Sequence, residues 1–187
     1  MATVAALRHW LPIALTGMLA LQAQVLGQRP PEYQVKAAYL YGFGQFVEWP
    51  PAAPAAADRA FVLCVLGADP FGHWLDEVAA DGVLNDKPVD VRRISRVGQS
   101  EPCHMLFISG SENARLSRTL EDLGRRPVLT VSDTPRFAER GGMIGFFLDG
   151  NRIRFTVNLT AAQEAGLQLN SELLRVAASI VRNPPGD

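Results

Sequence analysis

The chain has 187 residues, of which 48% are hydrophobic and 20% are charged. These values are typical of one globular domain and exclude a generally disordered or fibrous chain. The formal net charge is −1, so there is no basic excess to neutralise phosphates, and we expect no nucleic-acid partner.

Residues 1–27 have the pattern of a secretory signal peptide. Arg8 is their only formal charge, and an apolar run follows from Trp10 to Leu21. Gln22 ends this run too early for a membrane-spanning helix. Cleavage after Gly27 or, alternatively, after Ala23 would give an exported chain; an uncleaved anchor is the other interpretation.

Export would place the two cysteines of the chain in an oxidising compartment. In an oxidising compartment Cys64 and Cys103 are expected to form a disulfide, which requires that their segments be neighbours. Two separate buried thiols are the alternative. With only three histidines in the chain, we expect no metal site.

The mature chain begins with a predicted helix at Glu32–Trp49, which Pro50 and Pro51 terminate. Later helices are predicted at Phe71–Ala80, Asn113–Leu123, Ala161–Ala165 and Glu172–Arg182, with a single turn at Arg136–Arg140. Strands are predicted at Phe61–Leu66, Pro88–Ile94, Met105–Ile108, Pro127–Val131, Met143–Leu148 and Arg152–Val157.

These elements predict a single α/β domain over residues 32–182, followed by a disordered tail at 183–187. Alternation of strands and helices favours a mostly parallel sheet of about six strands with five or six helices. Asp149-Gly150-Asn151 between two apolar-rich runs indicates an antiparallel hairpin. If the crossovers are right-handed and the first strand lies inside the sheet, the strand order is second-first-third-fourth, which would place Cys64 beside Cys103.

A sheet of this kind binds ligands beyond the carboxyl ends of its strands. The side chains expected there are Asp69, Ser109 and Ser111, which form the candidate ligand cleft. The turn 67–72 lacks the glycine pattern of a dinucleotide site, and no Gly-x-Ser-x-Gly elbow surrounds a serine. We therefore expect neither a cofactor nor catalysis.

Aromatic residues gather in segment 39–49. One face of a helix cannot bury all of them, so Tyr41 and Trp49 are candidates for a patch that contacts a protein partner. The alternative is that this helix simply packs on the sheet.

Several strings, taken in order, resemble the YfiR-like family of small exported bacterial proteins over about residues 33–182. They are Val35–Tyr41, Phe46–Pro50, Val65–Gly72, Cys103–Ser109, Val128–Asp133, Gly141–Ile144, Val157–Leu159 and Ser171–Leu174.

The resemblance implies a periplasmic, non-catalytic repressor that contacts the periplasmic domain of an inner-membrane diguanylate cyclase or a related envelope sensor. It also implies a homodimer, and capture by a peptidoglycan-associated outer-membrane lipoprotein that releases the cyclase and favours biofilm. Cys64 and Cys103 match a family cysteine pair, whereas the second pair of some members is missing here. A periplasmic small-ligand receptor using Asp69, Ser109 and Ser111 is the alternative function.

Overall fold

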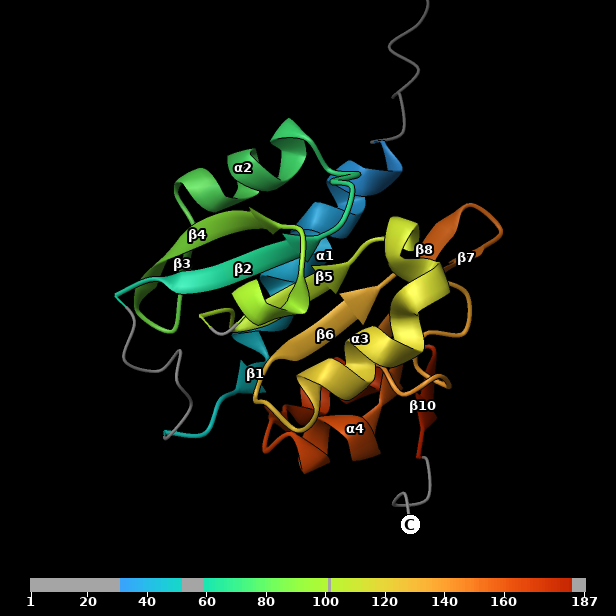
Figure 1. Ribbon diagram of the computed structural model, residues 1–187. Coiled ribbons are helices and arrows are strands. Elements are labelled where there is room, and N and C mark those ends of the chain that lie inside the picture. Colours follow the sequence, from blue (N-terminus) through green and yellow to red (C-terminus); the bar gives the residue numbers. More distant parts are fainter. Residues whose placement is uncertain (1–30, 52–58, 101, 183–187) are drawn as a thin grey trace, which may run out of the picture. The chain divides into compact units, whose positions relative to one another are not determined.

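The computed structural model describes residues 31–51, 59–100 and 102–182 (Figure 1). The predicted signal peptide and the predicted tail lie outside the described residues. Within the described part of the chain, no helix has the length and apolar character needed to cross a membrane.

The described residues form an eight-stranded sheet in which most neighbours are parallel. Its order is β10 (Ser179–Val181), β8 (Arg152–Asn158), β7 (Ile144–Asp149), β6 (Leu129–Ser132), β5 (Met105–Ile108), β2 (Phe61–Leu66), β4 (Lys87–Ile94) and β3 (Val83–Leu84). Antiparallel pairing is confined in this sheet to β7 with β8 and β3 with β4. The predicted α/β class is confirmed, and so is the order β4-β2-β5-β6 of the first four predicted strands.

Helices cover both faces of this sheet. In Figure 1, α1 lies behind the sheet and α3 lies in front of it. The α-helices among the described residues are α1 (Glu32–Gln45), α2 (His73–Ala80), α3 (Leu116–Leu123), α4 (Leu159–Glu164) and α5 (Ser171–Val176). The described residues also form 3-10 turns at Val97–Gln99 and Gly110–Arg115.

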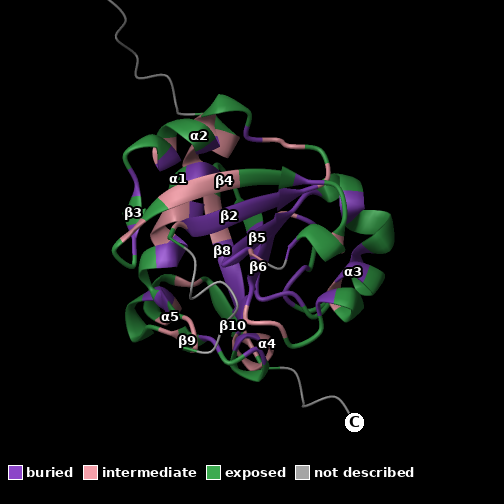
Figure 2. Cartoon of the chain, turned by 60° about the vertical axis from the view of Figure 1, so that its left-hand side comes forward, coloured by how far each residue is buried: buried purple, intermediate pink, exposed green. Residues whose placement is uncertain are grey.

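Strand β2 is buried on both faces and divides the core in two. Phe61, Leu63 and Val65 belong to the cluster under α1, α2, α4 and α5. Val62 and Cys64 belong to the cluster under α3. Because side chains alternate along a strand, a continuous apolar run is what burial on both faces requires. Figure 2 shows β2, β5 and β6 as the buried centre of the molecule.

The predicted helix at Glu32–Trp49 is too long. Helix α1 ends at Gln45, and β1 (Val47–Glu48) pairs antiparallel with β9 (Gln168–Leu169). The backbone N–H of Asn170 donates to the carbonyl of Phe46 at 2.9 Å, so a distant segment satisfies backbone groups just beyond the helix end. Sequence periodicity cannot reveal such a long-range partner.

The final helix is also shorter than predicted. Helix α5 ends at Val176, and Ser179–Val181 forms β10 parallel to β8 instead of continuing the helix. The cap is Asn170, whose Oδ1 accepts the Glu172 N–H at 2.8 Å. Strand β10 supplies backbone partners to the edge of β8 at Thr156–Asn158, and Ile180 is exposed.

The predicted hairpin is confirmed. Asp149 pairs with Arg152, which leaves Gly150 and Asn151 as a two-residue turn. Gly150 has φ +59°, the left-handed conformation that such turns require. The hairpin places β8 between β7 and β10 in the sheet.

Candidate functional site

The loops after β2 and β5 meet at the carboxyl edge of the sheet, where the candidate ligand cleft was predicted. Ser111 Oγ accepts the Ala68 N–H at 3.0 Å, and Ser109 Oγ accepts the Ser111 N–H at 3.3 Å. A Cβ on Gly67 would lie 2.4 Å from Ser111 Oγ, so the two loops are in close contact. Both serines therefore stabilise the loops themselves.

Asp69 lies in the same loop and is also engaged by the chain. Its Oδ1 accepts the Phe71 N–H at 2.7 Å, and its Oδ2 accepts from Arg93 Nε at 2.9 Å. The guanidinium of Arg93 also donates to both carboxylate oxygens of Asp76 at 2.7 Å. These hydrogen bonds lower the pKa of Asp76 and raise that of Arg93. Arg93 of β4 thus joins the loop, through Asp69, to α2, through Asp76.

A buried polar cluster lies beyond the end of β6, and sequence reasoning missed it. Lys36 of α1 is 3% exposed and donates to Asp133 Oδ2 at 2.6 Å, and it also pairs with Glu32. The Tyr33 hydroxyl donates to the same Asp133 oxygen at 2.8 Å. Burial, followed by the hydrogen bond to Asp133, raises the pKa of Tyr33 above its usual value. This cluster fastens α1 to the carboxyl edge of the sheet.

Of the two histidines among the described residues, one lies away from this edge and the other is exposed beside it. His104 precedes β5, at the amino end of the strand, where its Nδ1 accepts the Val62 N–H at 3.0 Å. His73 begins α2 and has its Nε2 3.9 Å from Glu77. In the part of the chain that the structure describes, no group of His, Cys, Asp and Glu could hold a metal ion.

The predicted disulfide is present. Cys64 and Cys103 are bonded, with their Cα atoms 5.9 Å apart, and both are fully buried. The bond connects β2 to the segment that leads into β5, its parallel neighbour. It therefore ties together the two strands whose loops form the carboxyl edge.

The two aromatic residues of the candidate partner patch are half-buried and anchored. The Tyr41 hydroxyl donates to the Val83 carbonyl at 3.1 Å. Trp49 Nε1 donates to the His104 carbonyl at 3.0 Å, and its ring meets Phe61 edge-on at 5.2 Å. Both side chains pack against the core, and their contact with a partner stays a prediction.

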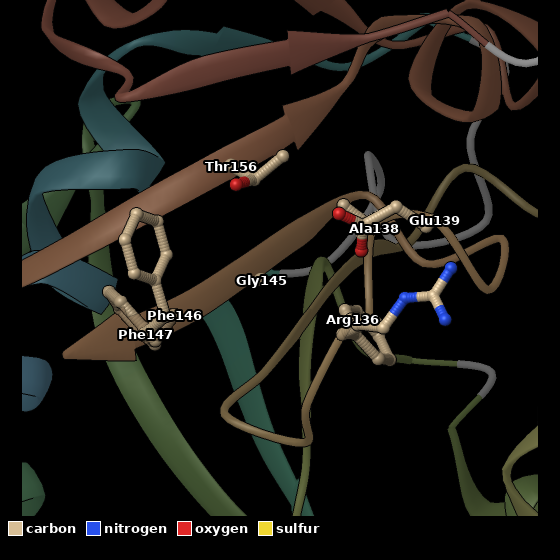
Figure 3. Close-up of a pocket in the computed structure, with 8 residues that line it drawn as sticks. Arg136, Ala138, Glu139, Gly145, Phe146, Phe147 and Thr156 are labelled. Atoms are coloured by element: carbon tan, nitrogen blue, oxygen red, sulfur yellow. The ribbon is translucent and has the colours of Figure 1, made fainter. Parts of the chain in front are cut away.

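Two surface hollows flank β8. The larger, about 410 Å³ and mostly apolar, lies between α1 and α5; we call it the α1–α5 groove. It is lined by Val35, Ala38, Tyr39, Gly42, Phe43, Phe46, Phe155, Glu172, Leu173 and Val176. The smaller, about 270 Å³, lies where segment 136–139 faces Gly145 and Phe147 of β7 and Thr156 of β8 (Figure 3).

The fold resembles solved structures at low sequence identity. A conserved domain protein from Vibrio cholerae O1 biovar El Tor superposes with a TM-score of 0.56 at 10% identity, covering 80% of this chain. The chain spans 60% of that protein's length. The ABC domain in complex with L-Trp from Streptococcus pneumonia has a TM-score of 0.48 at 10% identity, with 68% of this chain and 59% of that chain covered.

The sequence itself is more specific than the superposition. Residues 33–178 match the YfiR/HmsC-like family (DUF4154), and this range contains α1, the disulfide, the carboxyl edge and the hairpin. The match covers well over half of the chain, and the chain belongs to the YfiR/HmsC-like family.

Proposed function

We propose that this protein is a periplasmic, non-catalytic regulator that represses a membrane-bound diguanylate cyclase, or a related envelope sensor, by direct contact. The observation that carries the proposal is the family match over residues 33–178. The predicted signal peptide and the Cys64–Cys103 disulfide support an oxidising location outside the cytoplasm.

The distribution of polar and apolar side chains favours protein–protein contact over ligand binding or catalysis. The side chains of Asp69, Ser109 and Ser111 accept hydrogen bonds from the backbone of the loops at this edge. Large apolar side chains are instead exposed around β8 and the α1–α5 groove, including Leu148 at 57% and Val176 at 60%. Exposed apolar side chains that gather in one region are typical of protein-binding surfaces.

Repression by contact is a shift of a conformational equilibrium. A regulator that binds the inactive state of a sensor more tightly than the active state shifts the population by that difference in affinity. A hundredfold preference corresponds to about 2.7 kcal/mol. A lipoprotein that captures the regulator would return the sensor to its active state by mass action, and a homodimer would present the contact surface twice.

The direct test is deletion of the encoding gene with complementation. We expect cyclic-di-GMP to rise on deletion and to return to its starting level with the wild-type chain. Crosslinking in the cell envelope should recover an inner-membrane protein with a cyclase or sensor domain. A matched control is a chain whose residues 1–27 are removed, which should be made but should not restore repression. Unchanged cyclic-di-GMP on deletion would exclude a cyclase as the partner.

A further inference from the structure

Strand β8 is covered on its outer side along only half of its length. Strand β7 pairs with residues Arg152 to Val157, whereas β10 pairs only with Thr156, Val157 and Asn158. Within the described residues, Arg152–Phe155 therefore has a strand neighbour on one side alone. Figure 1 shows this part of the β7–β8 hairpin projecting beyond the rest of the sheet.

The backbone groups on this outer side can be assigned from one hydrogen bond. The Phe155 carbonyl accepts the Ala178 N–H at 2.9 Å, so it points away from β7. In an antiparallel pair the N–H and C=O of a residue point to the same side, and alternate residues repeat that direction. The N–H and C=O of Ile153 thus point outward as well. Ala178 already occupies the Phe155 carbonyl, so the N–H and C=O of Ile153 are the backbone groups with which this edge can accept another strand.

The side chains of this edge differ between the two faces. Phe155 lies on the face of the α1–α5 groove and lines it, and Ile153 shares that face. Arg152 and Arg154 point to the other face, and neither has an ion-pair partner among the residues described. Arg92, on β4 near the other edge of the sheet, is by contrast paired with Asp90 at 2.8 Å.

The charges of Arg152 and Arg154 determine which kind of strand can pair with this edge. Two copies of this edge paired antiparallel about a two-fold axis would bring arginines opposite arginines, and like charges in cross-strand pairs are destabilising. A strand with carboxylates at alternate positions would place them beside Arg152 and Arg154. Its intervening side chains would then point to the groove face, where an apolar residue is favoured.

We propose that an extended segment with acidic side chains alternating with apolar ones adds as a strand beside Arg152–Phe155. Its carboxylates pair with the two arginines, and its apolar side chains enter the α1–α5 groove. We assign this segment to the membrane partner, which rests on the proposed function, whereas the binding itself does not.

The test uses the purified mature chain and a blocked, fluorescently labelled peptide of alternating aspartate and valine, followed by fluorescence anisotropy. The control peptide has lysine in place of aspartate. We expect the acidic peptide to bind at least about tenfold more tightly, which corresponds to about 1.4 kcal/mol. In the double variant Arg152→Glu/Arg154→Glu this preference should reverse. Equal affinity for both peptides, or no binding of the acidic one, would overturn the proposal.

The backbone contribution is tested by Ile153→Pro. Proline removes an N–H that points outward, so the ladder with β7 keeps its hydrogen bonds. We expect loss of peptide binding, with circular dichroism unchanged. Arg92→Glu, the control for the double arginine variant, should bind the peptide as the wild type does. If Ile153→Pro does not fold, the peptide preference of the double arginine variant tests the proposal. Dimers in sedimentation that Ile153→Pro abolishes would assign the edge to a second copy and overturn the proposal.

Cellular measurements separate this inference from the proposed function. If deletion raises cyclic-di-GMP but the acidic peptide fails to bind, the function stands and the strand addition is wrong. If the peptide binds but deletion leaves cyclic-di-GMP unchanged, the edge is a binding site for a different partner. If both hold, the double arginine variant should fail to complement the deletion.

Discussion

Lys36 is a charged residue in an almost fully buried position. A buried ammonium group is tolerated only when carboxylates compensate for its lost hydration, and Asp133 and Glu32 do so here. Lys36→Met keeps the side-chain volume but leaves Asp133 without its cation. We expect a loss of about 3 kcal/mol in the free energy of unfolding, measured by urea titration of the oxidised protein.

The matched control is Arg118→Met. Arg118 also belongs to a helix ion pair, with Asp122, but both side chains are exposed and 4.0 Å apart. Its replacement should change the free energy of unfolding by less than about 0.5 kcal/mol. The double variant Lys36→Met/Asp133→Asn should recover part of the loss, because it removes the uncompensated carboxylate as well. Equal stability of Lys36→Met and wild type would show that the cluster is not stabilising.

The pair Arg93–Asp76 predicts a specific dependence of stability on pH. The pKa of Asp76 is lowered from its usual 3.8, chiefly by hydrogen bonds from Arg93. At pH values between the pKa of Asp76 in the folded protein and that in the unfolded chain, the unfolded chain binds more protons. The contribution of this pair to the free energy of unfolding is therefore full above about pH 4 and is lost as pH falls through the folded pKa. Arg93→Gln should be less stable than wild type at pH 7, and this difference should shrink at pH 2.5.

Chemical unfolding of both proteins at a series of pH values measures that difference. For Arg118→Gln the difference from wild type should stay small and constant over the same range. A gap between wild type and Arg93→Gln that persists undiminished at pH 2.5 would contradict the assignment of the low pKa to this arginine.

At the level of elements, the disulfide joins two strands that are already parallel neighbours. It closes a loop with a sequence separation of 39 residues, for which chain entropy gives a stabilisation of about 4 kcal/mol. Reduced protein should therefore unfold at a lower urea concentration. Because Cys64 and Cys103 are fully buried, a reductant should act slowly without urea and quickly near the unfolding midpoint.

The variant Cys64→Val/Cys103→Val is the matched control for this prediction. Its stability should be insensitive to reductant, whereas that of the wild type should fall. Fast reduction of the native protein in the absence of urea, followed by mass spectrometry of alkylated thiols, would contradict the burial argument.

Elements whose signals are local were predictable from sequence. The six apolar residues of β2 and the turn at Gly150 are examples. The two wrong helix boundaries have non-local causes, because β1 and β10 exist only through pairing with β9 and β8. A segment of two or three residues carries no periodicity of its own, so neither strand could be identified from sequence.

The candidate site shows the same division. The loops that hold Asp69, Ser109 and Ser111 follow parallel strands, so they were expected at one edge of the sheet, and they do meet there. Strand order alone does not determine that these side chains hydrogen-bond to the loop backbone. The contact of Lys36 with Asp133 spans 97 residues of sequence. Its one local signal was a lysine on the face of α1 that also carries Leu40 and Phe43.

At the scale of the whole molecule, the central strands make the two halves of the core depend on each other. Leu63 of β2 faces the cluster under α1, whereas Leu106 of β5 faces the cluster under α3. Both strands contribute side chains to both clusters, so neither cluster can be disrupted while the other keeps its sheet. We infer that the described domain unfolds as one cooperative unit.

The variants Leu63→Ala and Leu106→Ala test this inference from opposite faces. Both side chains are almost fully buried, so each truncation should cost about 2–5 kcal/mol. Tryptophan fluorescence, which reports on Trp49 and Trp74 beside the α1 cluster, and far-UV circular dichroism should give the same urea midpoint in each variant. Should Leu106→Ala lower the midpoint by circular dichroism alone, the α3 side would be a separate unit, and the sheet would not transmit stability between its faces.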